Sequence, residues 1–167
     1  MGAVAEPRPA ETDGPQPLAA NLGWLLAQAA HTLNTELTAA LERLFVTPRA
    51  YCVLSAAITG EFTQTELAQM VGLDKTTMVV TLDQLETAGL AKRVPSSEDR
   101  RARVVAVTKA GERKVAQAER IVEEIHADVL AAVPEGDRKH FVDALTCLVG
   151  GRLSEPAKCS HPVRRRS

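Results

Sequence analysis

Two short helical segments joined by a glycine turn restrict the fold of this chain more than any other feature. Thr63-Gln64-Thr65-Glu66 has the pattern of a capping box, which predicts a helix that starts there and runs to Met70. Gly72 then allows a tight turn, and Asp74 suits the N-cap of a next helix that ends before Gly89. A short helix, a glycine turn and a second helix together predict a helix-turn-helix.

A polar-tipped β-hairpin is predicted directly after these helices. Leu90–Val94 and Arg103–Val107 are apolar or alternating runs, and residues 95–101 between them are turn formers and charged residues. Residues 91–103 hold five Lys or Arg against two acidic residues, although the whole chain has a net charge of −1. A basic hairpin can be an ordinary solvated surface. Beside a helix-turn-helix, its charge favours contact with DNA phosphates and the minor groove.

Long helices are expected on both sides of this segment. Apolar residues recur with a helical period from Leu18 to Leu44, which predicts one long helix, and a helix of this length suggests a partner subunit. Thr47-Pro48 begins another helix, Thr108 caps a second long one and Pro134 opens the last. The expected organisation is a disordered extension (1–17), helical regions at 18–46 and 108–151, a central domain at 47–107 and a mobile basic tail (152–167).

Composition removes several classes of protein. Aromatic residues are 3% of the chain, too few for a single-strand binder that stacks bases on several rings. No apolar run approaches the roughly 20 residues that cross a bilayer, so we expect no membrane contact and a cytoplasmic protein. The three cysteines, Cys52, Cys147 and Cys159, are odd in number and lack metal-type spacing. They suit a reducing compartment better than a disulfide framework.

The motifs of the central domain resemble those of one known family. They are Leu73–Met78, Leu85-Glu86-x-x-Gly89-Leu90, Arg93, Asp99-Arg100-Arg101 and Val107-Thr108-x-x-Gly111. This pattern is similar to the winged-helix core of the MarR family, and the resemblance extends from about Leu18 to Gly150. It implies a mainly α fold with a small β-hairpin wing, in which a winged helix-turn-helix domain carries long N- and C-terminal dimerisation helices. It further implies a homodimer that binds palindromic double-stranded DNA operators, with no cofactor.

The DNA-contacting residues follow from this resemblance and from side-chain chemistry. Asp99 is expected to orient Arg101, which the resemblance places in the minor groove. The first turn of the recognition helix should face the major groove, where cations and hydroxyls contact phosphates or bases. The candidates for DNA contact are Gln64, Thr65, Lys75, Thr76, Thr77, Val79, Val80, Arg93, Asp99, Arg100, Arg101 and Arg103.

Val79 and Val80 depart from the common pattern of the family, because relatives often have a polar or basic residue there. Three interpretations remain open. The two side chains contact thymine methyl groups, line a ligand crevice beneath the helix, or widen the core face formed by Met78, Leu82 and Leu85.

A small-molecule effector is implied by the resemblance alone. Trp24, His31 and Tyr51 are ring side chains with a polar atom, which suits a ligand pocket, although each also fits an ordinary packing role. Urate is not supported, because Cys52 stands where urate-binding members have an acidic residue. Glu123-x-x-His126 has a metal-like spacing, but no facing carboxylates accompany it, and no metal site is predicted.

The sequence therefore predicts a dimeric, sequence-specific transcriptional regulator, a repressor released by a small-molecule ligand. A winged-helix protein interaction module is the first alternative, and a thiol-based redox sensor acting through Cys52 is the second. An enzyme is not expected, because the chain has no nucleophile elbow, phosphate-binding loop or convergent carboxylate pair.

Overall fold

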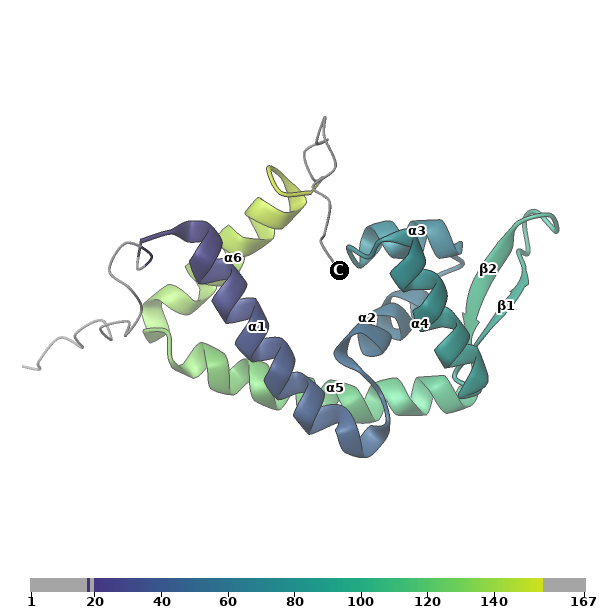
Figure 1. Ribbon diagram of the computed structural model, residues 1–167, viewed down its shortest axis with the longest axis horizontal. Coiled ribbons are helices and arrows are strands. Elements are labelled where there is room, and N and C mark those ends of the chain that lie inside the picture. Colours follow the sequence, from purple (N-terminus) through teal and green to yellow (C-terminus); the bar gives the residue numbers. More distant parts are fainter. Residues whose placement is uncertain (1–17, 19, 155–167) are drawn as a thin grey trace, which may run out of the picture. The chain divides into compact units, whose positions relative to one another are not determined.

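The computed structural model describes residue 18 and residues 20–154 (Figure 1). The expectations for residues 1–17 and for the tail from residue 155, Cys159 included, lie outside this part. The chain divides into two compact units between Val122 and Glu123, and each unit is described here by itself.

The first helix, α1 (Leu22–Leu41), is shorter at both ends than the sequence predicted. Its start is set by Asn21, whose side-chain oxygen accepts a hydrogen bond from the Trp24 amide at 2.9 Å. A short 3-10 helix, Glu42–Leu44, follows α1, and Phe45 then adopts a left-handed conformation with φ 54°. The expected single helix to Leu44 is therefore an α-helix to Leu41 followed by a 3-10 turn, and the positive φ of Phe45 ends the helical segment after Leu44.

The helix-turn-helix is confirmed with the predicted caps. It consists of α3 (Gln64–Met70) and α4 (Lys75–Thr87), and α2 (Pro48–Ile58) precedes it. Thr63 and Glu66 form the capping box of α3, and the Asp74 carboxylate accepts from the Thr77 amide at 3.0 Å to cap α4. Gly72 and Gly89 have φ values of 68° and 69°, the left-handed conformation that glycine adopts without strain.

The wing is an antiparallel hairpin of β1 (Ala91–Pro95) and β2 (Arg103–Val107) that projects beyond α4 (Figure 1). Its register pairs Ala91 with Val107 and Pro95 with Arg103. The first strand thus lies one residue later than predicted, because Leu90 is buried in the turn before it. The connection between α2 and α3 runs beside β2, where the Phe62 carbonyl accepts from the Val105 amide at 2.9 Å.

The core of the first unit lies beneath the helix-turn-helix and the wing. The predicted buried face of α4 is confirmed, since Met78 and Leu82 are fully buried and Leu85 nearly so. These side chains pack with residues from α2, α3 and both strands. The cluster contains Val46, Val53, Leu54, Ala57, Leu67, Ala68, Met78, Leu82, Leu85, Leu90, Ala91 and Val105.

Helix α5 (Lys109–Ala131) begins in a close contact with the base of the wing. The Thr108 hydroxyl donates to the Gly89 carbonyl at 2.8 Å and accepts from the Gly111 amide at 3.1 Å, as expected of an N-cap. A Cβ on Gly111 would lie 2.2 Å from the Leu90 carbonyl oxygen. Gly111 therefore lets α5 approach the backbone that leads into β1.

The second unit contains the end of α5 and helix α6 (Glu135–Gly150), which starts after Pro134 as predicted. None of the residues of α6 is buried. Phe141, Val142 and Val149 are 45%, 42% and 64% exposed, although an apolar face normally packs against another element. Within the described residues, no helix is long and apolar enough to span a membrane.

Candidate nucleic-acid interface

The N-terminal turn of α4 presents a cation and a hydroxyl to solvent. Lys75 and Thr76 are both exposed at the first two positions of the helix. Thr77, the third candidate, is used differently, because its hydroxyl donates to the Asp74 carboxylate at 2.6 Å. These hydrogen bonds from Thr77 lower the pKa of Asp74. Lys75 and Thr76 are therefore the side chains of this turn that remain available for DNA.

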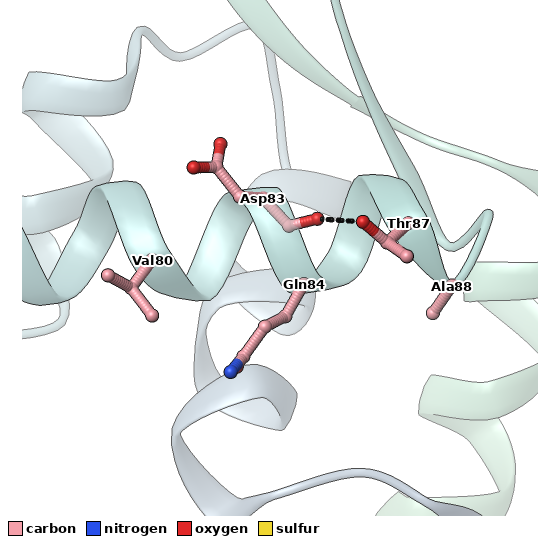
Figure 2. A pocket seen from close by; sticks show the side chains of 5 residues that line it. All are labelled: Val80, Asp83, Gln84, Thr87 and Ala88. Carbon is pink, nitrogen blue, oxygen red and sulfur yellow. Dashed lines mark hydrogen bonds between the residues drawn. The ribbon is translucent and has the colours of Figure 1, made fainter.

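Val80 does not belong to the core. It is 50% exposed, whereas Val79 is half-buried, so the interpretation as a wider core face fails for Val80. Val80 lines a shallow hollow of about 440 Å³ on the outer surface of α4, together with Gln84 one turn later (Figure 2). Figure 2 shows Val80 and Gln84 on one side of the helix and the Asp83 carboxylate directed away from them. Gln84 was not predicted, although its spacing of four residues from Val80 indicates the same face.

Arg93 differs from the other wing cations, because its guanidinium is paired with carboxylates. Its guanidinium forms ion pairs with Asp83 at 2.9 Å and with Glu86, and a weaker hydrogen bond to Gln64 at 3.3 Å. The Glu86 carboxylate also accepts from the Arg93 amide at 2.7 Å. Arg93 is thus not an unpaired cation, because two carboxylates neutralise its charge, and its expected DNA contact stays a prediction. Arg93 ties the first wing strand to α4 and to the start of α3.

The other wing cations have no such partners. Lys92, Arg100, Arg101 and Arg103 are exposed, and none forms an ion pair with another described residue. The wing therefore keeps a free basic surface even after the charge of Arg93 is removed. Unpaired cations on a projecting hairpin can neutralise DNA phosphates without first breaking an internal ion pair.

The Asp99 carboxylate stabilises the turn of the wing in a different way from the one expected. It accepts a hydrogen bond from the backbone amide of Arg101 at 2.9 Å, and the guanidinium of Arg101 is not its partner. The Asp99 carbonyl also accepts from the Ala102 amide at 2.9 Å. Asp99 thus sets the backbone that presents Arg101, and the Arg101 side chain stays free to enter a groove.

The start of α3 is a capped helix end at which the Thr65 side chain is exposed. Thr65 is exposed, while the Gln64 carbonyl oxygen is engaged by Arg93. The Thr63 amide and hydroxyl donate to the Glu66 carboxylate at 2.7 and 2.8 Å, and these bonds lower the pKa of Glu66. Thr65 therefore stays a candidate for phosphate contact, and Gln64 has a structural partner.

The three expected ligand residues do not converge on one pocket. His31 lines a groove of about 660 Å³ beside α1, whereas Trp24 and Tyr51 are outside its lining. Tyr51 is half-buried and packs against the core of the first unit. The groove was not predicted. Phe45 lines it and has a left-handed backbone conformation, which the periodicity of the sequence does not indicate. Its lining is His31, Asn34, Thr35, Thr38, Ala39, Glu42, Phe45, Val46 and Thr47.

Cys52 and Cys147 lie within the described residues, and so do His, Asp and Glu side chains of the kinds that bind metals. Cys52 and Cys147 are free, and desolvation raises the pKa of the Cys52 thiol. A thiol-based sensor needs the opposite shift, since the thiolate is the reactive form. Among residues 18 and 20–154, no three His, Cys, Asp or Glu side chains are grouped so that they could hold a metal ion.

Comparison with known proteins agrees with this geometry. Residues 46–102 match the sequence profile of the MarR family. The transcriptional regulator PA3341 is 30% identical, with a TM-score of 0.70 over 80% of this chain and 98% of its own. The chain belongs to the MarR family. It is therefore a winged-helix, DNA-binding transcriptional regulator by family and by fold.

One similar protein has been solved with two kinds of partner. CouR from Rhodococcus jostii RHA1, bound to p-coumaroyl-CoA, is 26% identical and has a TM-score of 0.73, over 87% of this chain and 100% of its own. The transcriptional repressor CouR, bound to a 23-mer DNA duplex, has a TM-score of 0.70 and 26% identity, over 80% of this chain and 95% of its own. CouR has thus been solved with p-coumaroyl-CoA and with a DNA duplex.

Proposed function

We propose that this MarR-family protein is a dimeric, sequence-specific repressor that a small molecule releases from DNA. The observation that supports DNA binding most directly is the group of unpaired wing cations, Arg100, Arg101 and Arg103, next to a recognition helix with an exposed first turn. A protein interaction module would not need this unpaired charge, since protein interfaces are depleted of Lys and gain affinity from apolar contacts. CouR, which is similar in fold, is a repressor with DNA bound.

Each exposed group has a role that its chemistry suits. Arg101 enters the minor groove, while Arg100 and Arg103 contact phosphates, as does Lys92. The first turn of α4 enters the major groove, where Lys75 and Thr76 contact phosphates or base edges. Further along α4, Val80 suits a thymine methyl group and the Gln84 amide suits an adenine edge. The Thr65 hydroxyl contacts the backbone of the duplex.

The dimer is supported by the apolar faces that a single chain leaves uncovered. Helix α6 buries no residue, and Leu22 and Leu25 of α1 are 59% and 37% exposed. Isolated helices of this length are marginal in water, so α6 needs a packing partner. A second copy of the chain supplies one, and a symmetric pair places two recognition helices on the two halves of a palindrome.

Replacing Phe141 by glutamate is expected to dissociate the dimer, because it places a charge in the apolar face of α6. Sedimentation at micromolar concentration should give twice the mass of the chain for the wild type and a monomer, or a strongly concentration-dependent mixture, for the variant. Thr146→Glu adds the same side chain on the other side of α6, five positions and about 140° around the helix from Phe141, and is expected to stay dimeric. A wild-type protein that sediments as a folded monomer would remove the dimer from the account.

The groove beside α1 is our candidate for the effector. Its lining combines the polar groups of His31, Asn34 and Thr38 with the exposed ring of Phe45. Such a mixture suits a small molecule with an apolar body and a few polar groups. The ligand releases DNA only if it binds more tightly to a conformation in which the recognition helices are misplaced.

Selection of bound duplexes from a random library tests this proposal. We expect the dimer to enrich an inverted repeat whose half-sites are about 10 bp apart from centre to centre, or a multiple of that spacing. Enrichment of no sequence, or of one unrepeated half-site, would contradict a dimeric, sequence-specific regulator. An enriched operator also provides the DNA for the variants described below.

A further inference from the structure

A single carboxylate before α3 holds the loop of the wing. Glu61 lies between α2 and α3, 35 positions before Ser96 in the sequence. Its Oε2 accepts hydrogen bonds from the Ser96 hydroxyl and from the Ser97 amide, each at 3.0 Å. The Ser96 hydroxyl accepts in turn from the Glu98 amide at 3.1 Å. One oxygen atom therefore organises three consecutive residues of the wing loop.

The backbone beside Glu61 is already attached to the rest of the domain. Phe62 accepts a hydrogen bond from Val105 of β2, and Thr63 forms an isolated bridge with Val104. Thr63 also caps α3. The carboxylate of Glu61 thus connects the wing loop to the start of the helix-turn-helix, at a point beyond the last paired residues of β1 and β2.

The rest of the wing loop is held only by short-range bonds. The Ser96 amide donates to the Ala102 carbonyl at 3.0 Å, and Asp99 bonds to the residues just after it. These bonds shape the loop but do not join it to another element. Glu61 supplies the contact that fixes where the loop stands relative to α3, and the loop contains Arg100 and Arg101.

We infer that Glu61 is a positioning residue for DNA binding, which clamps the wing loop so that Arg100 and Arg101 meet the duplex together with the recognition helix. The inference rests on the proposed function. For the loss of the Glu61 side chain, it predicts a change in DNA affinity opposite in sign to the change expected from charge alone. Removing a negative charge beside a basic wing should tighten DNA binding, whereas removing a clamp should weaken it.

Three variants separate the clamp from the charge. Glu61→Ala removes both hydrogen bonds and is expected to weaken operator binding by about 3- to 10-fold. Glu61→Gln removes the charge but keeps a carbonyl oxygen that can accept both bonds, so it should bind as tightly as the wild type or more tightly. Glu98→Gln removes a charge from the same loop without touching the clamp, since only the backbone amide of Glu98 is bonded to it. That control should bind at least as tightly as the wild type.

Ser96→Ala provides a test in which no charge changes. It removes one of the two bonds to Glu61 and should weaken binding by about 2- to 3-fold. It also keeps the test decisive if Glu61→Ala fails to fold. Hydrogen exchange at the Ser97 amide gives a readout without DNA, and it should be faster in Glu61→Ala than in the wild type or Glu61→Gln.

Two results would overturn the inference while leaving the proposed function intact. One is operator binding by Glu61→Ala or Ser96→Ala that is as tight as in the wild type, and the other is unchanged exchange at Ser97 in Glu61→Ala. Failure of the proposed function looks different, because the wild-type protein itself would then bind operator and scrambled duplex equally. That result would overturn the inference as well.

Discussion

Arg101→Ala is expected to weaken operator binding by about 10- to 100-fold and to leave the dimer folded, an effect of about 1.4–2.8 kcal/mol. Arg101 is exposed and has no ion-pair partner among the described residues. Removing its side chain is therefore not expected to lower the stability of the fold. Its guanidinium is presented by a turn that the Asp99 carboxylate holds at the Arg101 amide. A narrow minor groove attracts an inserted arginine strongly, and the variant loses this contact.

Fluorescence anisotropy with the selected operator measures this effect, and Arg101→Lys is the matched control. Lysine keeps the charge and loses the planar fork, so it should bind with an affinity between those of the alanine variant and the wild type. The slope of log affinity against log salt should also fall by about one in the alanine variant. Equal affinities for the wild type and Arg101→Ala would remove Arg101 from the interface.

Gly111→Ala is expected to destabilise the protein by about 2–4 kcal/mol, the largest effect on folding that we predict for a single methyl group. The added Cβ would lie 2.2 Å from the Leu90 carbonyl oxygen and 2.6 Å from Cγ1 of Val107. Neither neighbour can easily move away, because the Leu90 carbonyl accepts from the Thr108 amide at 3.0 Å and Val107 is paired with Ala91. The clash must therefore displace α5 from the base of the wing.

Thermal and chemical denaturation check this prediction, with Gly136→Ala as the control. Gly136 lies in the first turn of α6, and a Cβ there would meet no atom within 4 Å. Alanine at that position should leave stability unchanged or raise it by up to about 1 kcal/mol through helix propensity. Equal stability of Gly111→Ala and the wild type would contradict the close approach between α5 and the wing.

The local elements were predictable from sequence because their signals are local. The Thr63–Glu66 capping box, the Asp74 cap and the positive φ of Gly72 and Gly89 each depend on residues within one turn. The motif Val107-Thr108-x-x-Gly111 likewise has a physical reason, since the threonine caps α5 and the glycine lets it approach Leu90.

The partners of charged side chains were not predictable in the same way. Arg93 counted as one of five wing cations, yet its carboxylate partners lie ten and seven positions earlier and its amide partner 29 positions earlier. Charge counting cannot distinguish such an internal pair from a free cation. Glu61 was missed for the same reason, because its contacts to the wing span 35 and 36 positions of the sequence.

The ligand site was the least predictable part. Trp24, His31 and Tyr51 were grouped by chemical type, and only His31 lines the groove. The end of α1 was also extended too far, because helical periodicity continues through residues 42–44 while Phe45 turns the chain with a positive φ. The Phe45 side chain is 93% exposed after this turn. Its position depends on the path of the backbone, which no local pattern in the sequence predicts.

The most direct test of the account is anisotropy of the wild-type protein with the selected operator and with a scrambled duplex, over a series of salt concentrations. We predict operator binding that is at least about a thousandfold tighter than binding to the scrambled duplex. The affinity should fall steeply as salt rises, because several phosphates are neutralised by unpaired cations. Equal binding to both duplexes, or an affinity that does not change with salt, would contradict a sequence-specific regulator that reads DNA through its recognition helix and basic wing.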